Sequence, residues 1–136
     1  MNLVIFDTSI LVNDFREGTY ENRVQSVAGL IRLSSVVLAE LWRGAATSVE
    51  RKLLLELTKN HPVLSPTTKH WIESGQILNK MRADLGFTPD KLRTLHFDVL
   101  IALTARAHGA RLITANTNDF KLIHRYRKFD MEVWGS

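Results

Sequence analysis

Short apolar runs alternate with longer segments of helical spacing along this chain. Residues 3–6 form an uninterrupted apolar run, which is typical of a strand buried on both faces of a parallel sheet. The predicted strands are residues 3–6, 32–33, 63–64, 112–114 and 131–133. The predicted helices are residues 9–15, 22–29, 36–46, 48–59, 66–85 and 99–105, with a short last helix that ends near residue 124.

Strands that alternate with helices indicate an α/β fold, in which helices cover both faces of a central, mostly parallel sheet. About five short strands are expected in this sheet. The chain has 136 residues, of which 45% are hydrophobic. A chain of this size forms one domain that buries roughly two thirds of its unfolded surface. We therefore expect a single domain over residues 1–136.

Local patterns predict where the helices of the second half begin. Ser65 followed by Pro66 is a start signal, because a capping residue precedes proline at the first helical position. Residues 87–95 are predicted to form a loop, and Asp98 then opens a helix that is apolar almost all round. The buried stripe of the helix at 66–85 is expected at Trp71, Gly75, Leu78 and Leu85.

Four carboxylates stand out by their positions. Asp7 ends the first strand, and open α/β sheets bind their ligands beyond the strand ends. Glu40 lies in an apolar helix after the second strand, Asp98 opens the buried helix, and Asp119 follows the fourth strand. Buried acids are rare unless they are paired or bind a metal ion. The four acids therefore need an explanation.

Each acid has an ordinary structural alternative. Asp7 can cap the helix that follows it, Glu40 can pair with Arg43 or Lys52, and the other two acids can be helix-start and turn residues. In a doubly wound sheet, however, the ends of the first and fourth strands converge on one crevice. Four like charges there would repel unless a divalent cation neutralised them. Because the chain has no cysteine, the ligands are oxygens, which favours Mg²⁺ or Mn²⁺.

Net charge and metal together indicate the chemistry. Eighteen Lys and Arg against 14 Asp and Glu give a net charge of +4, which favours a polyanionic partner such as nucleic acid. A water bound to a divalent cation is an improved nucleophile, so phosphodiester hydrolysis would need no catalytic serine or cysteine. The lack of cysteine and of any apolar run near the ~20 residues of a membrane span leads us to expect a cytoplasmic protein with no membrane contact.

Four segments together resemble the PIN domain family, and specifically its VapC-type toxin ribonucleases. They are FDTSILV (6–12), SVVLAELWRG (35–44), FDVLIALTA (97–105) and LITANTNDF (112–120). The resemblance implies a three-layer α/β/α domain over residues 1–136 that acts as a Mg²⁺- or Mn²⁺-dependent endoribonuclease with one or two ions. It also implies a toxin of a type II toxin-antitoxin pair, with a VapB-type antitoxin that covers the site, a homodimer and a higher assembly with the antitoxin.

The resemblance also assigns residues. Asp7 and Asp98 would be the main ligands of the first metal ion, while Glu40 and Asp119 would complete the site and help to activate the attacking water. Many relatives have an acid where this chain has Asn116, so a second ion would bind more weakly. The polar positions around the acids are Thr8, Ser9, Thr114 and Asn116, and the candidate contacts to RNA phosphates are Arg43, Lys91 and Arg93.

Other protein classes fit the sequence less well. A phosphotransfer fold of the haloacid dehalogenase type needs a second acid two residues after Asp7, where this chain has Ser9. A receiver domain would need paired acids before Asp7 and a lysine near the last strand, and neither pattern occurs. The remaining alternative is a non-catalytic PIN-like module that binds nucleic acid or a protein and keeps the acids as a vestige.

Overall fold

A computed structural model describes residues 2–18 and 21–135 of the chain. In this part, five strands form one sheet of order β3-β2-β1-β4-β5, and every neighbouring pair is parallel. The strands are β1 (Leu3–Phe6), β2 (Leu30–Ser34), β3 (Val63–Leu64), β4 (Arg111–Thr114) and β5 (Met131–Val133). The predicted α/β fold is confirmed, and the sheet is wholly parallel.

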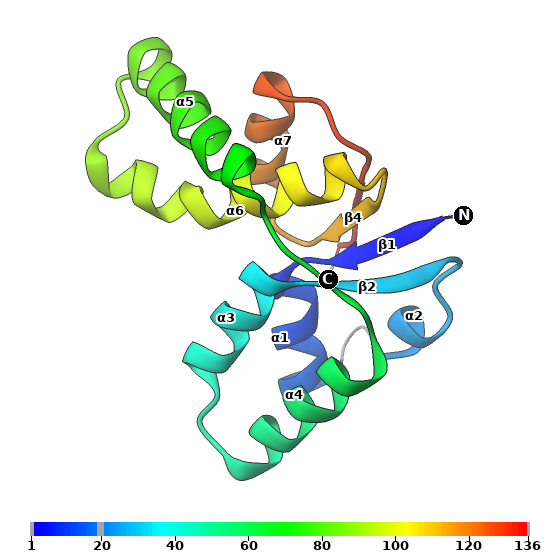
Figure 1. Cartoon of the computed structure of the whole chain (residues 1–136). Coiled ribbons are helices and arrows are strands. Elements are labelled where there is room, and N and C mark those ends of the chain that lie inside the picture. The colour runs from blue at the N-terminus through cyan, green and yellow to red at the C-terminus, as the bar shows by residue number, and fades with distance from the viewer. Residues whose placement is uncertain (1, 19–20, 136) are drawn as a thin grey trace.

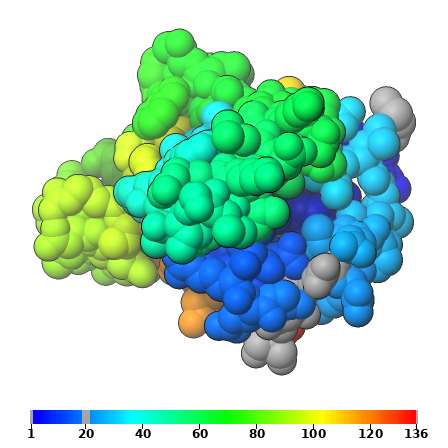
Figure 2. Space-filling view, turned by 90° about the horizontal axis from the view of Figure 1, so that it is seen from below, coloured from blue at the N-terminus to red at the C-terminus, as the bar shows by residue number. Residues whose placement is uncertain are grey.

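Helices cover both faces of the sheet. They are α1 (Thr8–Glu17), α2 (Glu21–Gln25), α3 (Ser35–Gly44), α4 (Ser48–Asn60), α5 (Thr68–Leu85), α6 (Pro89–Ala107) and α7 (Thr117–Tyr126). Figure 1 shows α1 to α4 on one side of the sheet and α5 to α7 on the other. In Figure 2, the turn between α5 and α6 projects beyond the rest of the molecule. Among the described helices, none has both the length and the apolar character needed to cross a membrane.

The strand order changes direction between β1 and β4. From β1 the chain proceeds through β2 to β3 on one side, then crosses back to place β4 on the other side of β1. A hydrogen bond of 2.9 Å from the Asp7 amide to the Ile113 carbonyl joins the two strands at their carboxyl ends. Such a switch point leaves a crevice beyond the strand ends, where doubly wound sheets bind ligands.

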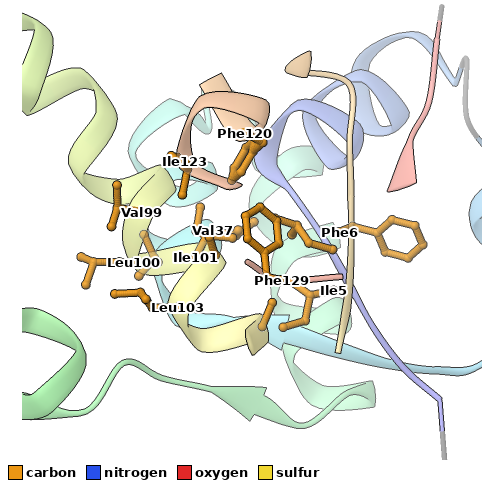
Figure 3. Close-up of a cluster of buried hydrophobic side chains, with 14 of the residues drawn as sticks. Ile5, Phe6, Val37, Val99, Leu100, Ile101, Leu103, Phe120, Ile123 and Phe129 are labelled. Atoms are coloured by element: carbon orange, nitrogen blue, oxygen red, sulfur yellow. The ribbon is translucent and has the colours of Figure 1, made fainter. Parts of the chain in front are cut away.

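The main core lies between the sheet and the helices α6 and α7. Residues 99–105 of α6 are all buried, as predicted from their apolar sequence. Figure 3 shows their side chains beside those of β1 and α7. Phe120 and Phe129 meet edge to face with their ring centroids 6.3 Å apart. Because α6 is buried around most of its circumference, its position relative to β1 is rigidly defined by packing.

The predicted loop at residues 87–95 is wrong, because α6 begins at Pro89. Thr88 caps this helix by accepting a hydrogen bond of 3.3 Å from the amide of Lys91. Proline at the first helical position needs no amide donor and has the correct φ. Asp98 is therefore in the third turn of a long helix, with Lys91 two turns before it on the same side. It does not open a helix.

The predicted start of the preceding helix is wrong by two residues. Thr67 is the cap of α5 and forms a reciprocal pair with His70, so Ser65 and Pro66 lie outside the helix. The predicted stripe is correct only at Leu78, since Trp71 is 48% exposed and Leu85 is 41% exposed. The buried residues of α5 are Ser74, Ile77, Leu78 and Met81. The helix predicted at 22–29 is also shorter and ends at Gln25.

Gly29 occupies a position that only glycine can adopt without strain. Its φ is +128°, and a Cβ there would lie 2.7 Å from the Asn2 carbonyl oxygen and 2.9 Å from Cγ2 of Val4. The Gly29→Ala variant is therefore expected to lose about 3 kcal/mol of unfolding free energy, measured by chemical denaturation. Gly75→Ala is the control, because Gly75 lies in α5 and a Cβ added to it would meet no atom within 4 Å. That variant should gain up to about 1 kcal/mol.

Candidate active site

Asp7 lies at the carboxyl end of β1 and is 3% exposed. It occupies the cap position of α1, but its side chain makes no capping hydrogen bond. Its Oδ2 atom instead accepts hydrogen bonds of 2.8 Å from Ser9 Oγ and 2.8 Å from Thr114 Oγ1. Burial raises the pKa of the Asp7 carboxyl, and the two hydroxyl donors oppose this only in part. A capping role alone therefore does not account for the buried Asp7 carboxylate.

The two hydroxyls beside Asp7 are held by the backbone that follows β4. Ser9 Oγ accepts a hydrogen bond of 3.1 Å from the Ala115 amide, and Thr114 Oγ1 accepts one of 2.9 Å from the Asn116 amide. An oxygen that accepts from an amide is left with its own proton to donate. Both hydroxyls are thus oriented to donate to Asp7, which stabilises the carboxylate without neutralising its charge.

Glu40 reaches the same end of the sheet from α3. Its Oε1 atom accepts a hydrogen bond of 2.8 Å from Thr8 Oγ1 at the start of α1. Burial is the main cause that raises the pKa of Glu40, and the nearby charge of Asp7 adds to it. Arg43 is 4.0 Å from Oε2, but the arginine side chain is 72% exposed, and such exposed pairs contribute little. The pairing with Arg43 therefore does not explain why Glu40 is half-buried.

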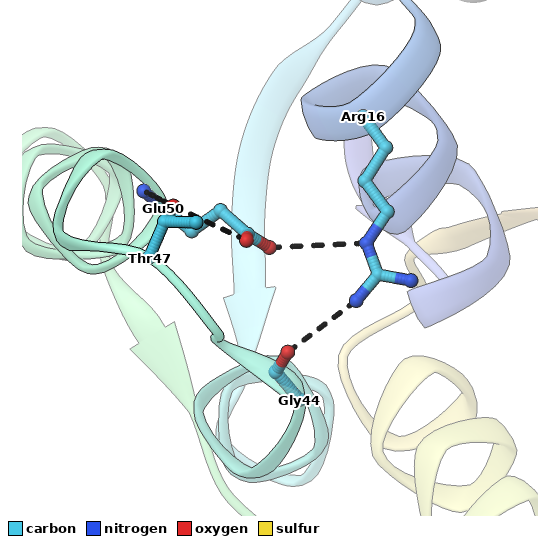
Figure 4. Close-up of polar contacts among 4 residues, drawn as sticks. All are labelled: Arg16, Gly44, Thr47 and Glu50. Atoms are coloured by element: carbon cyan, nitrogen blue, oxygen red, sulfur yellow. Dashed lines mark hydrogen bonds and ion pairs between the residues drawn. The ribbon is translucent and has the colours of Figure 1, made fainter.

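Polar contacts from α1 and α4 fix the end of α3. Ser34 caps the start of this helix, accepting hydrogen bonds from the amides of Val36 and Val37. At the other end, Arg16 of α1 donates to the Gly44 carbonyl at 3.3 Å and lies 3.8 Å from Glu50 of α4 (Figure 4). A helix held at both ends has little freedom to turn, so the side of α3 that carries Glu40 stays directed toward α1.

Asp98 is at the electrostatic centre of the four acids. Burial raises its pKa most, and the charges of Asp7, Glu40 and Asp119 raise it further, to about 8. Lys91 is the one described cation that lowers it. These interactions place the four carboxylates, which come from β1, α3, α6 and α7, in one neighbourhood at the switch point of the sheet.

Asp119 lies in the first turn of α7, and both of its oxygens have partners. Its Oδ1 atom is 3.5 Å from the ammonium of Lys91. Its Oδ2 atom accepts a hydrogen bond of 3.2 Å from the amide group of Asn116. Asp119 differs in this from the other three acids, because it already faces a protein cation that is partly buried.

The carboxylates fit a hydrated divalent cation. Among residues 2–18 and 21–135, no group of three or more acidic or histidine side chains is placed so that it could hold a metal ion by itself. Mg²⁺ does not need such a group, since it keeps several waters and uses one or two carboxylates together with substrate phosphates. The buried carboxylates near Asp98 repel one another, and a divalent ion would remove this repulsion. The oxygen donors match the hard cations Mg²⁺ and Mn²⁺.

The predicted basic residues lie in two places. Arg43 and Arg93 line a hollow of about 340 Å³ beside Glu40, together with Thr94 and Phe97. Arg93 is also paired with Asp90 on the surface of α6. Lys91 is not part of this hollow, because its ammonium points to Asp119. Two basic side chains are therefore available at the mouth of the site and one lies within it.

Thr8, Ser9 and Thr114 contact the acids where the resemblance put polar positions, but sequence reasoning missed Phe87, Thr94 and Phe97. Phe97 and Thr94 line the hollow beside Glu40, and the ammonium of Lys91 lies 5.9 Å from the centre of the Phe87 ring. The helical spacing of Lys91, Thr94 and Asp98 in the sequence could have indicated that these residues lie together. A helix that begins at Pro89 places Lys91, Thr94 and Asp98 on one side, whereas a loop gives them no defined relation.

The chain belongs to the PIN domain family, since a model of that family matches residues 4–126. No curated protein matches the chain. Several solved structures are similar to the chain. VapBC2 from Rickettsia felis, bound to a DNA fragment from their promoter, has a chain with a TM-score of 0.71 and 24% identity. That match covers 97% of this chain and 98% of the other.

A second similar structure is a toxin-antitoxin complex from Klebsiella pneumoniae. It matches with a TM-score of 0.62 and 21% identity, covering 86% of this chain and 89% of the other. At these identities the similarity concerns the fold. The parallel α/β sheet of this chain agrees with its membership of the PIN domain family.

Proposed function

We propose that this PIN domain protein is a metal-dependent endoribonuclease of the VapC type and acts as the toxin of a toxin-antitoxin pair. The observation that carries the proposal is the position of the partly buried Asp98 within the electrostatic reach of Asp7, Glu40 and Asp119. Buried like charges are costly to a fold. They are explained when the site binds a divalent cation, and the membership of the PIN domain family supports this interpretation.

The residues divide into binding and activating groups. Asp7 and Asp98 would hold a Mg²⁺ or Mn²⁺ ion, with Glu40 beside them. When bound, the ion would supply a more acidic water and positive charge next to the phosphate. In hydrolysis the water oxygen forms a bond to phosphorus while the bond from phosphorus to the leaving ribose oxygen breaks. Glu40, whose pKa is raised by burial, is suited to accept the proton that the water loses.

Neighbouring hydroxyls and basic residues serve this chemistry. Ser9 and Thr114 orient Asp7 through their hydrogen bonds. Arg43 and Arg93 line the hollow next to Glu40, where they can contact the phosphates that flank the bond to be broken. The net charge of +4 includes the clustered acids, so the remaining surface is more positive than the net charge indicates. RNA is the polyanion that we propose as substrate.

A VapB-type antitoxin is the protein partner that we propose. The two similar structures are toxin-antitoxin complexes, and such a partner would cover the carboxylate site and the hollow beside it. A homodimer, and a larger assembly with the antitoxin, belong to the same proposal. The non-catalytic alternative gains no support from a specific observation, and the experiment below separates it from the nuclease.

The purified chain is expected to cleave RNA only with a divalent cation. Cleavage of total cellular RNA should occur with Mg²⁺ or Mn²⁺ and stop when EDTA removes the ion, because the water needs the ion for activation. Glu40→Gln should reduce the rate by roughly 100-fold. Glu56→Gln is the matched control, since Glu56 is an exposed residue of α4. Full activity in EDTA would exclude the metal mechanism, and RNA binding without cleavage would support the non-catalytic module.

A further inference from the structure

The four acids of the site are not equally supplied with positive charge. Asp7 and Glu40 accept hydrogen bonds from the hydroxyls of Ser9, Thr114 and Thr8, which are neutral donors. Glu40 also has Arg43 at 4.0 Å, but the arginine side chain is 72% exposed and its charge is largely screened by water. Asp119 instead has the ammonium of Lys91 at 3.5 Å and the amide of Asn116 at 3.2 Å. The excess negative charge therefore lies on the side of Asp7, Glu40 and Asp98, while the side of Asp119 has its own cation.

Lys91 is held in place from three directions. Its backbone amide donates to the cap residue Thr88 in the first turn of α6. Its side chain reaches over the ring of Phe87, with the ammonium 5.9 Å from the ring centre. The ammonium is directed to Asp119, which Asn116 holds from the other side. The side chain of Lys91 is still 43% exposed, so a phosphate bound at the acids can reach the ammonium.

This geometry matters for the number of cations. A second divalent ion in a carboxylate site lies about 3.5–4 Å from the first and needs carboxylate oxygens of its own. The oxygens available for that purpose are those of Asp119, and both have partners. Asn116 contributes a donor group at this place, where an aspartate would contribute a further acid. A second ion would have to displace the Lys91 ammonium from Asp119. It would then be repelled by that ammonium, which would still lie nearby.

We propose that the ammonium of Lys91 takes the place of a second divalent cation, so that each site of this protein binds one ion. This inference rests on the proposed function and specifies its mechanism. The single ion would be held by Asp7 and Asp98, with Glu40 beside it, and the ammonium of Lys91 would face the phosphate from the side of Asp119. In this role Lys91 acts through its charge, as fixed cations do in phosphoryl transfer.

Titration of the full chain with Mn²⁺, followed by calorimetry and by the electron paramagnetic resonance of free Mn²⁺, tests the proposal. The wild type should bind one ion per chain. Lys91→Met combined with Asn116→Asp should bind two, because the ammonium is removed and a carboxylate is added. Lys121→Met combined with Asn118→Asp is the control. It makes the same change of charge at exposed residues of α7 and should bind one ion.

The single variant Lys91→Met gives a second test that does not depend on the double variant folding. It should bind the first Mn²⁺ several-fold more tightly, because a nearby positive charge is lost, and yet cleave RNA about 100-fold more slowly. A residue with only a structural role would not move these two quantities in opposite directions. Unchanged cleavage would overturn the proposal, as would two ions in the wild type or one ion in a folded double variant. A wild type that binds no ion would overturn the proposed function itself.

Discussion

The Asp98→Asn variant is expected to lose RNA cleavage by roughly a thousandfold while remaining folded. The charges of Asp7, Glu40 and Asp119 all act on Asp98, so removing its charge should weaken the binding of a cation among them. Asparagine has the same shape but no charge, and the loss of one preorganised charged group costs up to about this factor. The measurement is the initial rate of cleavage at saturating Mg²⁺, with Mn²⁺ affinity measured on the same samples.

Asp90→Asn is the matched control for this variant. Asp90 is on the same helix, but it is an exposed residue of the first turn and pairs with Arg93 at the surface. Its substitution should leave cleavage and Mn²⁺ affinity within about twofold of wild type, because exposed pairs contribute little. If Asp98→Asn cleaved RNA as rapidly as Asp90→Asn, the acids at the switch point would not be the active site.

The metal-free protein is expected to lose stability as the pH rises from about 4 to about 8. The pKa of Asp98 is raised from 3.8 to about 8 in the folded state, so the folded chain binds this proton more tightly than the unfolded chain. Protonation therefore favours folding, and stability falls between the two pKa values and becomes level above the higher one. The pKa values of Asp7 and Glu40 are raised as well, so their contributions have the same sign.

Thermal unfolding in EDTA over this pH range measures the effect. In Asp98→Asn the part of the loss that comes from Asp98 should disappear, and the metal-free variant should be more stable than wild type near pH 8, because a neutral amide replaces a partly buried charge. Asp90→Asn should keep the wild-type pH dependence. Mn²⁺ should restore the stability of the wild type at the upper end of the range, since it binds only the folded state. Stability that rose with pH in EDTA would contradict the shift of Asp98.

Elements with a clear apolar pattern could be predicted from the sequence. The four apolar residues of β1 predicted a buried strand, and the apolar residues 99–105 predicted a buried helix. The parallel sheet followed from the alternation of strands and helices. The start of α6 was missed because Thr88 and Pro89 were assigned to a loop, although proline is also a frequent first residue of a helix. At Ser65 and Pro66 the opposite error occurred, since Thr67 provides the cap.

The site could be predicted as a set of acids with polar residues around them, but not as a set of contacts. Asp7 and Asp119 follow strands that meet at the switch point, so their proximity follows from the fold. The hydrogen bonds around them do not follow from any local pattern. Lys91 and Asp119 are 28 residues apart, and Thr8 and Glu40 are 32 apart. Such pairs depend on how α6 and α3 pack against their neighbours, which the order of residue types does not determine.

The hydrogen bond between Asp7 and Thr114 joins residues that are 107 positions apart. During translation Asp7 leaves the ribosome early, but β4, Thr114 and Asp119 emerge only after most of the chain has been synthesised. A nascent chain that lacks β4 has no partner strand for one edge of β1 and therefore no assembled site. If the protein is the nuclease proposed above, its active site is assembled only after β4 and Asp119 have been synthesised.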